Sequence, residues 1–228
     1  MLLAAHSVTS TDVVHCGDAR VLCEGLRAGS VDLIFTDPPY FRDCLWMYGW
    51  LAVMAARVLR PGGWLLAMGG GQYADVILPA MARHLTYHYT LEVALTGTAT
   101  ATLRPHGQTT PVIARTKPIY AFAKGRAMPR TVVYTPFAGD GNDKRWHHWG
   151  QDLKSARYFV DCFSQPGDLV LDPFVGGGTT ALVCKHLDRR FIGMDSDPAA
   201  VETTRGRLRN PYYAPRLEAG QLTLAFAR

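Results

Sequence analysis

The sequence is poor in cysteine and in charge, and it contains no long apolar run. Its five cysteines are scattered, odd in number and never paired at the short spacings of zinc or redox sites, which favours free thiols in a reducing compartment. No stretch approaches the roughly 18 uninterrupted apolar residues of a membrane span. The first ten residues lack the charged front of a secretory signal. We therefore expect a soluble, cytoplasmic protein without membrane association.

The length and composition favour one compact domain. The chain has 228 residues, of which 48% are hydrophobic, 11% are aromatic and 19% are charged. These values exclude a coiled coil, collagen and a disordered chain. A chain of this length can bury the core of one α/β domain and carry at most a small insertion.

Acidic residues are absent between Glu92 and Asp140, although the chain as a whole carries a net charge of +5. A basic segment of this kind favours a polyanion as partner. An ordinary basic face balanced by acids elsewhere would give the same pattern, so charge alone leaves both interpretations open. The candidates for contact with nucleic acid, in this stretch and shortly after it, are Arg104, Arg115, Lys117, Lys124, Arg126, Arg130, Lys144 and Arg145.

Strand-like and helix-like segments alternate along the chain, a pattern typical of a mostly parallel sheet covered by helices on both faces. We expect seven strands, at 13–15, 31–36, 64–68, 89–95, 118–122, 169–171 and 191–194. We expect helices at 19–26, 45–59, 73–84, 155–163, 179–186 and 198–208. Residues 125–150 show little periodicity and predict an inserted, substrate-facing segment between the two parts of the domain, 1–124 and 151–228.

A strand, a glycine-rich turn and a helix start follow one another over residues 169–180. Glycines in such a turn let the backbone approach a ligand closely. Asp195 follows Asp172 by 23 residues, just past the next strand, where a carboxylate can accept hydrogen bonds from both ribose hydroxyls of an adenosine cofactor. Together these features predict a nucleoside-cofactor site at the carboxyl edge of the sheet.

Asp37-Pro38-Pro39-Tyr40 follows the strand expected at 31–36. Neither proline can continue a central strand, so these four residues form a rigid loop at the carboxyl end of that strand. Asp37 and the Pro38 carbonyl offer two acceptors for the two hydrogens of an exocyclic amino group. The ring of Tyr40 offers a flat face for the base that bears the amino group. The tetrad therefore predicts a site for an aminated nucleobase.

Three other interpretations start from the same residues. Gly176 to Ala181 also satisfies the pattern of a nicotinamide or flavin site, but an oxidoreductase leaves the tetrad unused. A DNA-binding module without activity would not need the tetrad and the glycine turn, yet both are intact here, which disfavours that interpretation. Methylation of cytosine C5 requires a cysteine nucleophile, usually after a proline, and none of the five cysteines follows a proline.

The tetrad and the glycine turn together resemble those of the DNA amino-methyltransferases, enzymes that use S-adenosylmethionine to methylate adenine N6 or cytosine N4. The tetrad precedes the glycine turn here, as in the beta group of that family. The resemblance implies a circularly permuted Rossmann-like methyltransferase fold, with residues 125–150 as the target-recognition segment. Supporting matches lie at Gly17-Asp18, 30–33, 58–63, 117–119 and 166–168.

The resemblance also implies roles for individual residues. Asp37, Pro38, Pro39 and Tyr40 would be catalytic and would grip a base flipped out of double-stranded DNA. The residues expected to bind the cofactor are Asp18, Asp172, Pro173, Phe174, Gly176, Gly178, Thr179, Thr180 and Asp195. Aspartate at the first tetrad position favours adenine over cytosine among relatives. Relatives often form dimers, so a homodimer is an open expectation, and whether a nuclease partner exists is left open.

The chain departs from the family just before the helix expected at 155–163. Relatives often carry a threonine and a lysine-proline pair there, whereas this chain has His147-His148-Trp149-Gly150. Adjacent histidines suggest a metal site, but no further ligands with suitable spacing follow, so we expect no metal. The neighbouring Arg145, Trp146 and Trp149 can stack on bases or pack as a lid, and the sequence favours neither.

Overall fold

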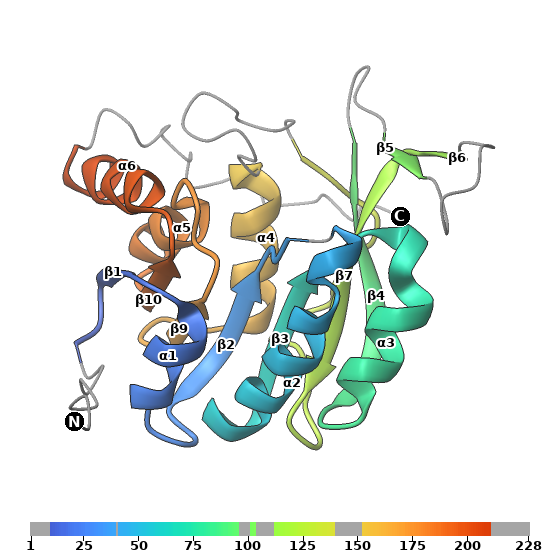
Figure 1. Ribbon diagram of the computed structural model, residues 1–228, viewed down its shortest axis with the longest axis horizontal. Coiled ribbons are helices and arrows are strands. Elements are labelled where there is room, and N and C mark those ends of the chain that lie inside the picture. The colour runs from blue at the N-terminus through green and yellow to red at the C-terminus, as the bar shows by residue number, and fades with distance from the viewer. Residues whose placement is uncertain (1–9, 40, 96–100, 104–111, 140–151, 211–228) are drawn as a thin grey trace, which may run out of the picture.

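The computed structural model describes residues 10–39, 41–95, 101–103, 112–139 and 152–210. Its centre is an eight-stranded sheet with helices on both faces (Figure 1). The strand order is β1-β10-β9-β2-β3-β7-β4-β8. The first five strands in this order are mutually parallel, and β7 runs antiparallel to both of its neighbours. Within the described residues, no helix is long and apolar enough to cross a bilayer.

The bounds of most elements lie within three residues of those expected from the sequence, but β3 begins five residues before its predicted start and α1 ends four residues before its predicted end. The sheet strands are β1 (Val13–Cys16), β2 (Val31–Thr36), β3 (Leu59–Met68), β4 (Thr86–Ala94), β7 (Thr116–Ala123), β8 (Phe137–Ala138), β9 (Leu169–Asp172) and β10 (Arg190–Asp195). A separate pair is formed by β5 (Ala101–Leu103) and β6 (Val112–Ala114). The helices are α1 (Ala19–Leu22), α2 (Trp46–Val58), α3 (Ala74–Ala82), α4 (Leu153–Phe163), α5 (Thr179–His186) and α6 (Pro198–Arg209), with single 3-10 turns η1 (Cys23–Gly25), η2 (Arg42–Cys44) and η3 (Gly71–Tyr73).

Two hydrophobic cores lie on opposite faces of the sheet. The helices α1, α2 and α3 cover one face, where Leu51 and Ile34 are fully buried. The helices α4, α5 and α6 cover the other, where Phe159 and Phe35 are fully buried (Figure 1). Successive residues of β2 thus enter different cores because side chains alternate across a strand. This explains why the sequence of β2 is an almost uninterrupted apolar run.

The α/β class and the mostly parallel sheet expected from the sequence are confirmed, but the expected number of seven strands is wrong. The eighth strand is β8, whose two residues pair with Val93 and Ala94 at the edge of the sheet. It lies inside the segment 125–150, for which we predicted an insertion. The strands β5 and β6 lie in a region expected to be a loop. Strands of two or three residues are too short to show an alternating pattern.

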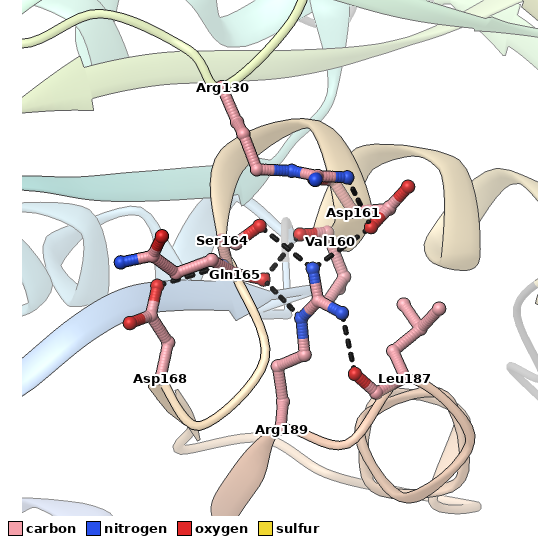
Figure 2. Close-up of polar contacts among 8 residues, drawn as sticks. All are labelled: Arg130, Val160, Asp161, Ser164, Gln165, Asp168, Leu187 and Arg189. Carbon is pink, nitrogen blue, oxygen red and sulfur yellow. Dashed lines mark hydrogen bonds and ion pairs between the residues drawn. The ribbon is translucent and has the colours of Figure 1, made fainter.

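A network of ion pairs and hydrogen bonds links Arg130 to α4 and to the residues that flank β9 and β10 (Figure 2). Asp161 lies on α4, and its Oδ1 accepts hydrogen bonds from two guanidinium groups. Arg130 donates at 2.8 Å and Arg189 at 2.9 Å. The side chain of Arg189 is only 3% exposed, and it also donates to Ser164 and to the Leu187 carbonyl. Asp161 therefore supplies the negative charge that compensates a buried cation.

Removal of this carboxylate should destabilise the fold. We expect Asp161→Ala to lower the free energy of unfolding by about 3 kcal/mol, because the Arg189 guanidinium stays buried without its counter-charge. The control is Glu202→Ala, which removes the exposed ion pairs to Arg205 and Arg209 and should cost less than about 1 kcal/mol. Urea unfolding of both variants measures the difference, and equal losses would contradict this role of Asp161.

Candidate functional site

The strands β9 and β2 are neighbours in the sheet, but the helices that follow them lie on opposite faces. After β9 the chain continues into α5 on one face, and after β2 it continues into α2 on the other. In open α/β sheets, ligands bind outside the carboxyl ends of the strands at such a switch point. The carboxyl ends of β9 and β2 are Asp172 and Thr36, which are followed directly by the glycine turn and by the tetrad.

The tetrad leaves the sheet at this switch point, as the sequence predicts. Its first two residues are shielded from solvent: Pro38 is buried, and the side chain of Asp37 is 11% exposed. Asp37 Oδ2 accepts a hydrogen bond of 2.6 Å from Lys117 Nζ. Asp37 Oδ1 is buried and has no hydrogen-bond partner among the described residues. Tyr40 lies outside the described residues. The tetrad thus presents one buried acceptor to which none of the described residues donates.

A hydrogen bond joins the tetrad to the glycine turn. Thr36 Oγ1, directly before Asp37, donates to Asp172 Oδ1 at 2.7 Å. The other oxygen of Asp172 accepts from Thr180 Oγ1 at 2.6 Å, and Oδ1 also accepts from the Phe174 amide. Burial raises the pKa of Asp172 to about 6, and these hydrogen bonds oppose the rise. Asp172 and Thr180 therefore brace the turn from the inside, and Pro173 and Thr179 are also buried.

The glycine turn is tight and is supported by α6. Gly176 and Gly178 have φ values of +49° and +84°, a region that favours glycine. A Cβ atom on Gly178 would lie 2.6 Å from a Thr204 methyl group. Thr204 Oγ1 in turn donates to the Gly176 carbonyl at 2.7 Å, and Arg207 donates to the Gly177 carbonyl. Sequence reasoning missed Thr204 and Arg207, since nothing local links α6 to the turn.

Two carboxylates lie at the ends of the next strands along the sheet. Asp195 ends β10, and its Oδ2 and Oδ1 accept hydrogen bonds of 2.9 Å from the Gly176 and Asp197 amides. A carboxylate oxygen can accept more than one hydrogen bond, so both oxygens keep acceptor capacity. Asp18 follows β1 and is paired with Arg20, which lowers the pKa of Asp18. The strand register brings these carboxylates to the same edge as Asp172.

Aromatic side chains of α2 border the turn on the side of the tetrad. Trp50 contacts Phe174 edge to face, with ring centroids 6.2 Å apart. Trp46 is half exposed, and the guanidinium of Arg20 lies 5.3 Å from the centre of its ring. Such surfaces suit a planar ring system. Neither tryptophan was predicted from the sequence as a site residue. Both lie on α2, where apolar side chains are expected simply to pack the helix against the sheet.

The predicted DNA-contacting residues separate into two groups. Arg115 and Lys117 lie at the start of β7, at the carboxyl edge of β3, because β7 runs antiparallel to β3. Lys124 and Arg126 follow the other end of β7, and Lys124 Nζ donates to the carbonyl of Leu59 at the start of β3. A strand as long as β7 separates the two ends by about 25 Å.

Arg130 belongs with the distant group, since its amide donates to Cys162 near the end of α4. The remaining predicted residues, Arg104, Lys144 and Arg145, lie outside the described residues, as do the two histidines at 147 and 148. In the part of the chain that the structure describes, no group of three or more His, Cys, Asp or Glu side chains could hold a metal ion.

Comparisons with known proteins agree with this geometry. Residues 140–205 match a family model described as DNA methylase, N6_N4_Mtase. The type II methyltransferase M.HpaI of Haemophilus parainfluenzae is 27% identical over 233 residues, which cover 85% of this chain and 73% of that protein. The crystal structure of an M1.HpyAVI-SAM complex has a TM-score of 0.70 at 22% identity, covering 86% of this chain and 98% of that one. PvuII DNA methyltransferase, described as cytosine-N4-specific, has a TM-score of 0.75 at 17% identity, covering 89% and 88%.

The chain shares its α/β fold with these solved methyltransferases, and its glycine turn and tetrad lie at one edge of the sheet. The family-model match over residues 140–205 and the similarity to M.HpaI are both to DNA methyltransferases, and they agree with the resemblance carried by the tetrad and the glycine turn. The nicotinamide and flavin interpretation of the glycine turn is set aside, because it accounts for neither the tetrad nor the matches.

The raised pKa of Asp172 predicts a pH-dependent contribution to stability. The folded protein binds this proton more tightly than the unfolded chain, so the contribution is full in acid and is lost as the pH rises through about 6. We therefore expect the unfolding free energy of Asp172→Asn, measured relative to that of the native protein, to rise by about 2 kcal/mol between pH 4 and pH 7. Urea unfolding at several pH values measures the difference, and a difference that does not change with pH would contradict the assignment.

Proposed function

We propose that this protein transfers the methyl group of S-adenosylmethionine to N6 of an adenine flipped out of double-stranded DNA. The observation that carries the proposal is the buried Oδ1 of Asp37, beside the glycine turn, which has no hydrogen-bond partner in the part of the chain that the structure describes. A buried acceptor without a donor costs free energy, so it is an expected feature of a site that a ligand completes. An exocyclic amino group supplies the missing N–H donor.

The residues at the carboxyl edge fit the cofactor. Asp195 keeps acceptor capacity for ribose hydroxyls, and the positive φ values of Gly176 and Gly178 permit close approach of the backbone. Phe174 and Trp50 offer an apolar border. When bound, S-adenosylmethionine supplies a methyl group on a sulfonium, which is already a good electrophile.

The tetrad then has to make the amino nitrogen nucleophilic. The lone pair of this nitrogen is delocalised into the base, and hydrogen bonds to Asp37 and to the Pro38 carbonyl favour a more tetrahedral nitrogen with an available pair. If the amino nitrogen takes the methyl group, the electrons of the methyl–sulfur bond would stay on sulfur, and the nitrogen would carry a positive charge until one of its protons passes to solvent. The carboxylate of Asp37 stabilises that developing charge.

A base stacked in duplex DNA cannot reach acceptors that are buried at the edge of a sheet. We therefore infer base flipping, in which the target nucleotide leaves the stack before methyl transfer. Tyr40, the last residue of the tetrad, would replace the lost stacking. For the base itself, aspartate as the first tetrad residue favours adenine by family resemblance. The fold is shared with a cytosine-N4-specific enzyme, so cytosine N4 is the alternative.

The role of Asp37 can be tested by methyl transfer. We expect Asp37→Ala to lower the transfer rate by about 1,000-fold, because the amino group loses its charged acceptor, while affinity for S-adenosylmethionine stays within a factor of about three. Labelled methyl groups followed by nucleoside analysis measure the rate and identify the base. The exposed Glu24 provides the control variant Glu24→Ala. A near-normal rate in Asp37→Ala would contradict the role of Asp37. Label on cytosine would overturn adenine as the target base, and label on neither base would overturn the proposed function.

Phosphates that flank the flipped base would meet the carboxyl edge of the sheet. Two exposed arginines lie there, Arg42 in η2 after the tetrad and Arg115 before β7. We therefore propose that these two contact DNA, in place of Lys124, Arg126 and Arg130 at the opposite edge. Sequence reasoning missed Arg42, because it lies outside the acid-free stretch.

This assignment predicts the salt dependence of DNA binding. Arg42→Ala together with Arg115→Ala should reduce the slope of log affinity against log salt by about 2, since each lost phosphate contact removes about 0.9. The matched control is Lys124→Met with Arg126→Ala, which removes two charges from the far edge and should leave the slope unchanged. Titrations of DNA at several salt concentrations measure both, and a slope that falls only in the control pair would refute the orientation.

A further inference from the structure

Lys117 and Asp37 are 80 residues apart in sequence, yet they form an ion pair inside the candidate site. Lys117 lies on β7 and Asp37 follows β2, and in the sheet these two strands are separated by β3. The lysine reaches past the end of β3 because β7 begins at the edge where β2 and β3 finish. The order and direction of the strands therefore bring this ammonium group to the tetrad.

Few side-chain atoms occupy the space at the end of β3, because three glycines follow the strand. Met68 is its last residue, and Gly69, Gly70 and Gly71 follow. A Cβ atom on Gly69 would lie 2.7 Å from the ring of Tyr120, so this position cannot carry a larger residue without movement. The Gly69 amide donates to the Pro118 carbonyl, next to Lys117, at 3.3 Å. The glycine triplet, which sequence analysis did not assign to a function, thus keeps β3 and the start of β7 close together.

The ion pair is largely hidden from solvent. The side chains of Lys117 and Asp37 are 22% and 11% exposed, and Nζ lies 2.6 Å from Oδ2. A carboxylate this buried is costly unless a cation compensates it. Lys117 also occupies only one of the two carboxylate oxygens, and Oδ1 is left without a partner among the described residues. Among the described residues, Oδ2 is therefore engaged by Lys117, and Oδ1 is the oxygen that a ligand can reach.

We propose that Lys117 is a positioning residue for methyl transfer: it holds Asp37 Oδ2, so that Oδ1 keeps the place and the charge needed to accept from the target amino group. This inference rests on the proposed function. It assigns Lys117 to positioning Asp37, whereas the sequence suggested a contact between Lys117 and a DNA phosphate. Fixing one oxygen restricts rotation of the carboxylate about its Cβ–Cγ bond. A displacement of about 1 Å at a reacting group can lower a rate by about 100-fold.

The test compares Lys117→Met and Lys117→Arg with the native enzyme, and uses Lys185→Met as the matched control. Lys185 is exposed on α5 and donates to the Leu208 carbonyl. We expect Lys117→Met to lower kcat by about 100-fold, with KM for DNA within about twofold and an unchanged salt slope. Lys117→Arg should recover at least about a tenth of native kcat, because a guanidinium can also donate to Oδ2. Lys185→Met should match the native enzyme.

Three results would overturn the inference. The first is native kcat in Lys117→Met with a salt slope reduced by about 1, the signature of a phosphate contact. The second is an equal loss of kcat in the methionine and arginine variants together with a lowered Tm in both, the signature of a merely structural role. The third is a native protein that transfers no methyl group to DNA, which removes the proposed function as well, whereas the first two leave that function intact.

Discussion

The hydrogen bond from Thr36 to Asp172 is the contact on which the site depends. These residues end β2 and β9, the two strands on either side of the switch point, so the bond fixes the tetrad next to the glycine turn. A methyl transfer needs its two reactants in line and in contact, and each of these loops would hold one of them. Burial of Asp172 raises its pKa, because desolvation opposes the charged form, and we therefore expect the stability of the fold to depend on pH.

Sequence reasoning succeeded where the local chain dictates the structure. The prolines after Thr36 end β2 at the predicted residue, and Gly176 and Gly178 adopt the backbone conformations for which glycine is suited. Each helix from α4 onward begins within two residues of its predicted start; α4 and α6 begin at the capping residues Asp152 and Asp197. These features depend on a few neighbouring residues, so a single sequence contains enough information to predict them.

The rest of the site depends on contacts between distant segments. The antiparallel direction of β7 decides which basic residues lie at the carboxyl edge of the sheet, and the sequence of β7 does not reveal that direction. Lys117 and Lys124 are seven residues apart and look equivalent as cations, yet one pairs with Asp37 and the other donates to Leu59 at the opposite edge. For the same reason the support of the glycine turn by Thr204 was not predicted. Strand order and direction are properties of the whole chain, and charge patterns do not encode them.

The most direct test of the central claim is a crystal structure of this protein with S-adenosylhomocysteine and an unmethylated DNA duplex. The duplex would contain the sequence that the enzyme is found to methylate. Our account predicts a base outside the duplex, with its amino nitrogen about 3 Å from Asp37 Oδ1 and its ring between the tetrad and the cofactor sulfur. A base that remains stacked in the duplex, or a cofactor sulfur too far from Asp37 to leave a base between them, would contradict the account.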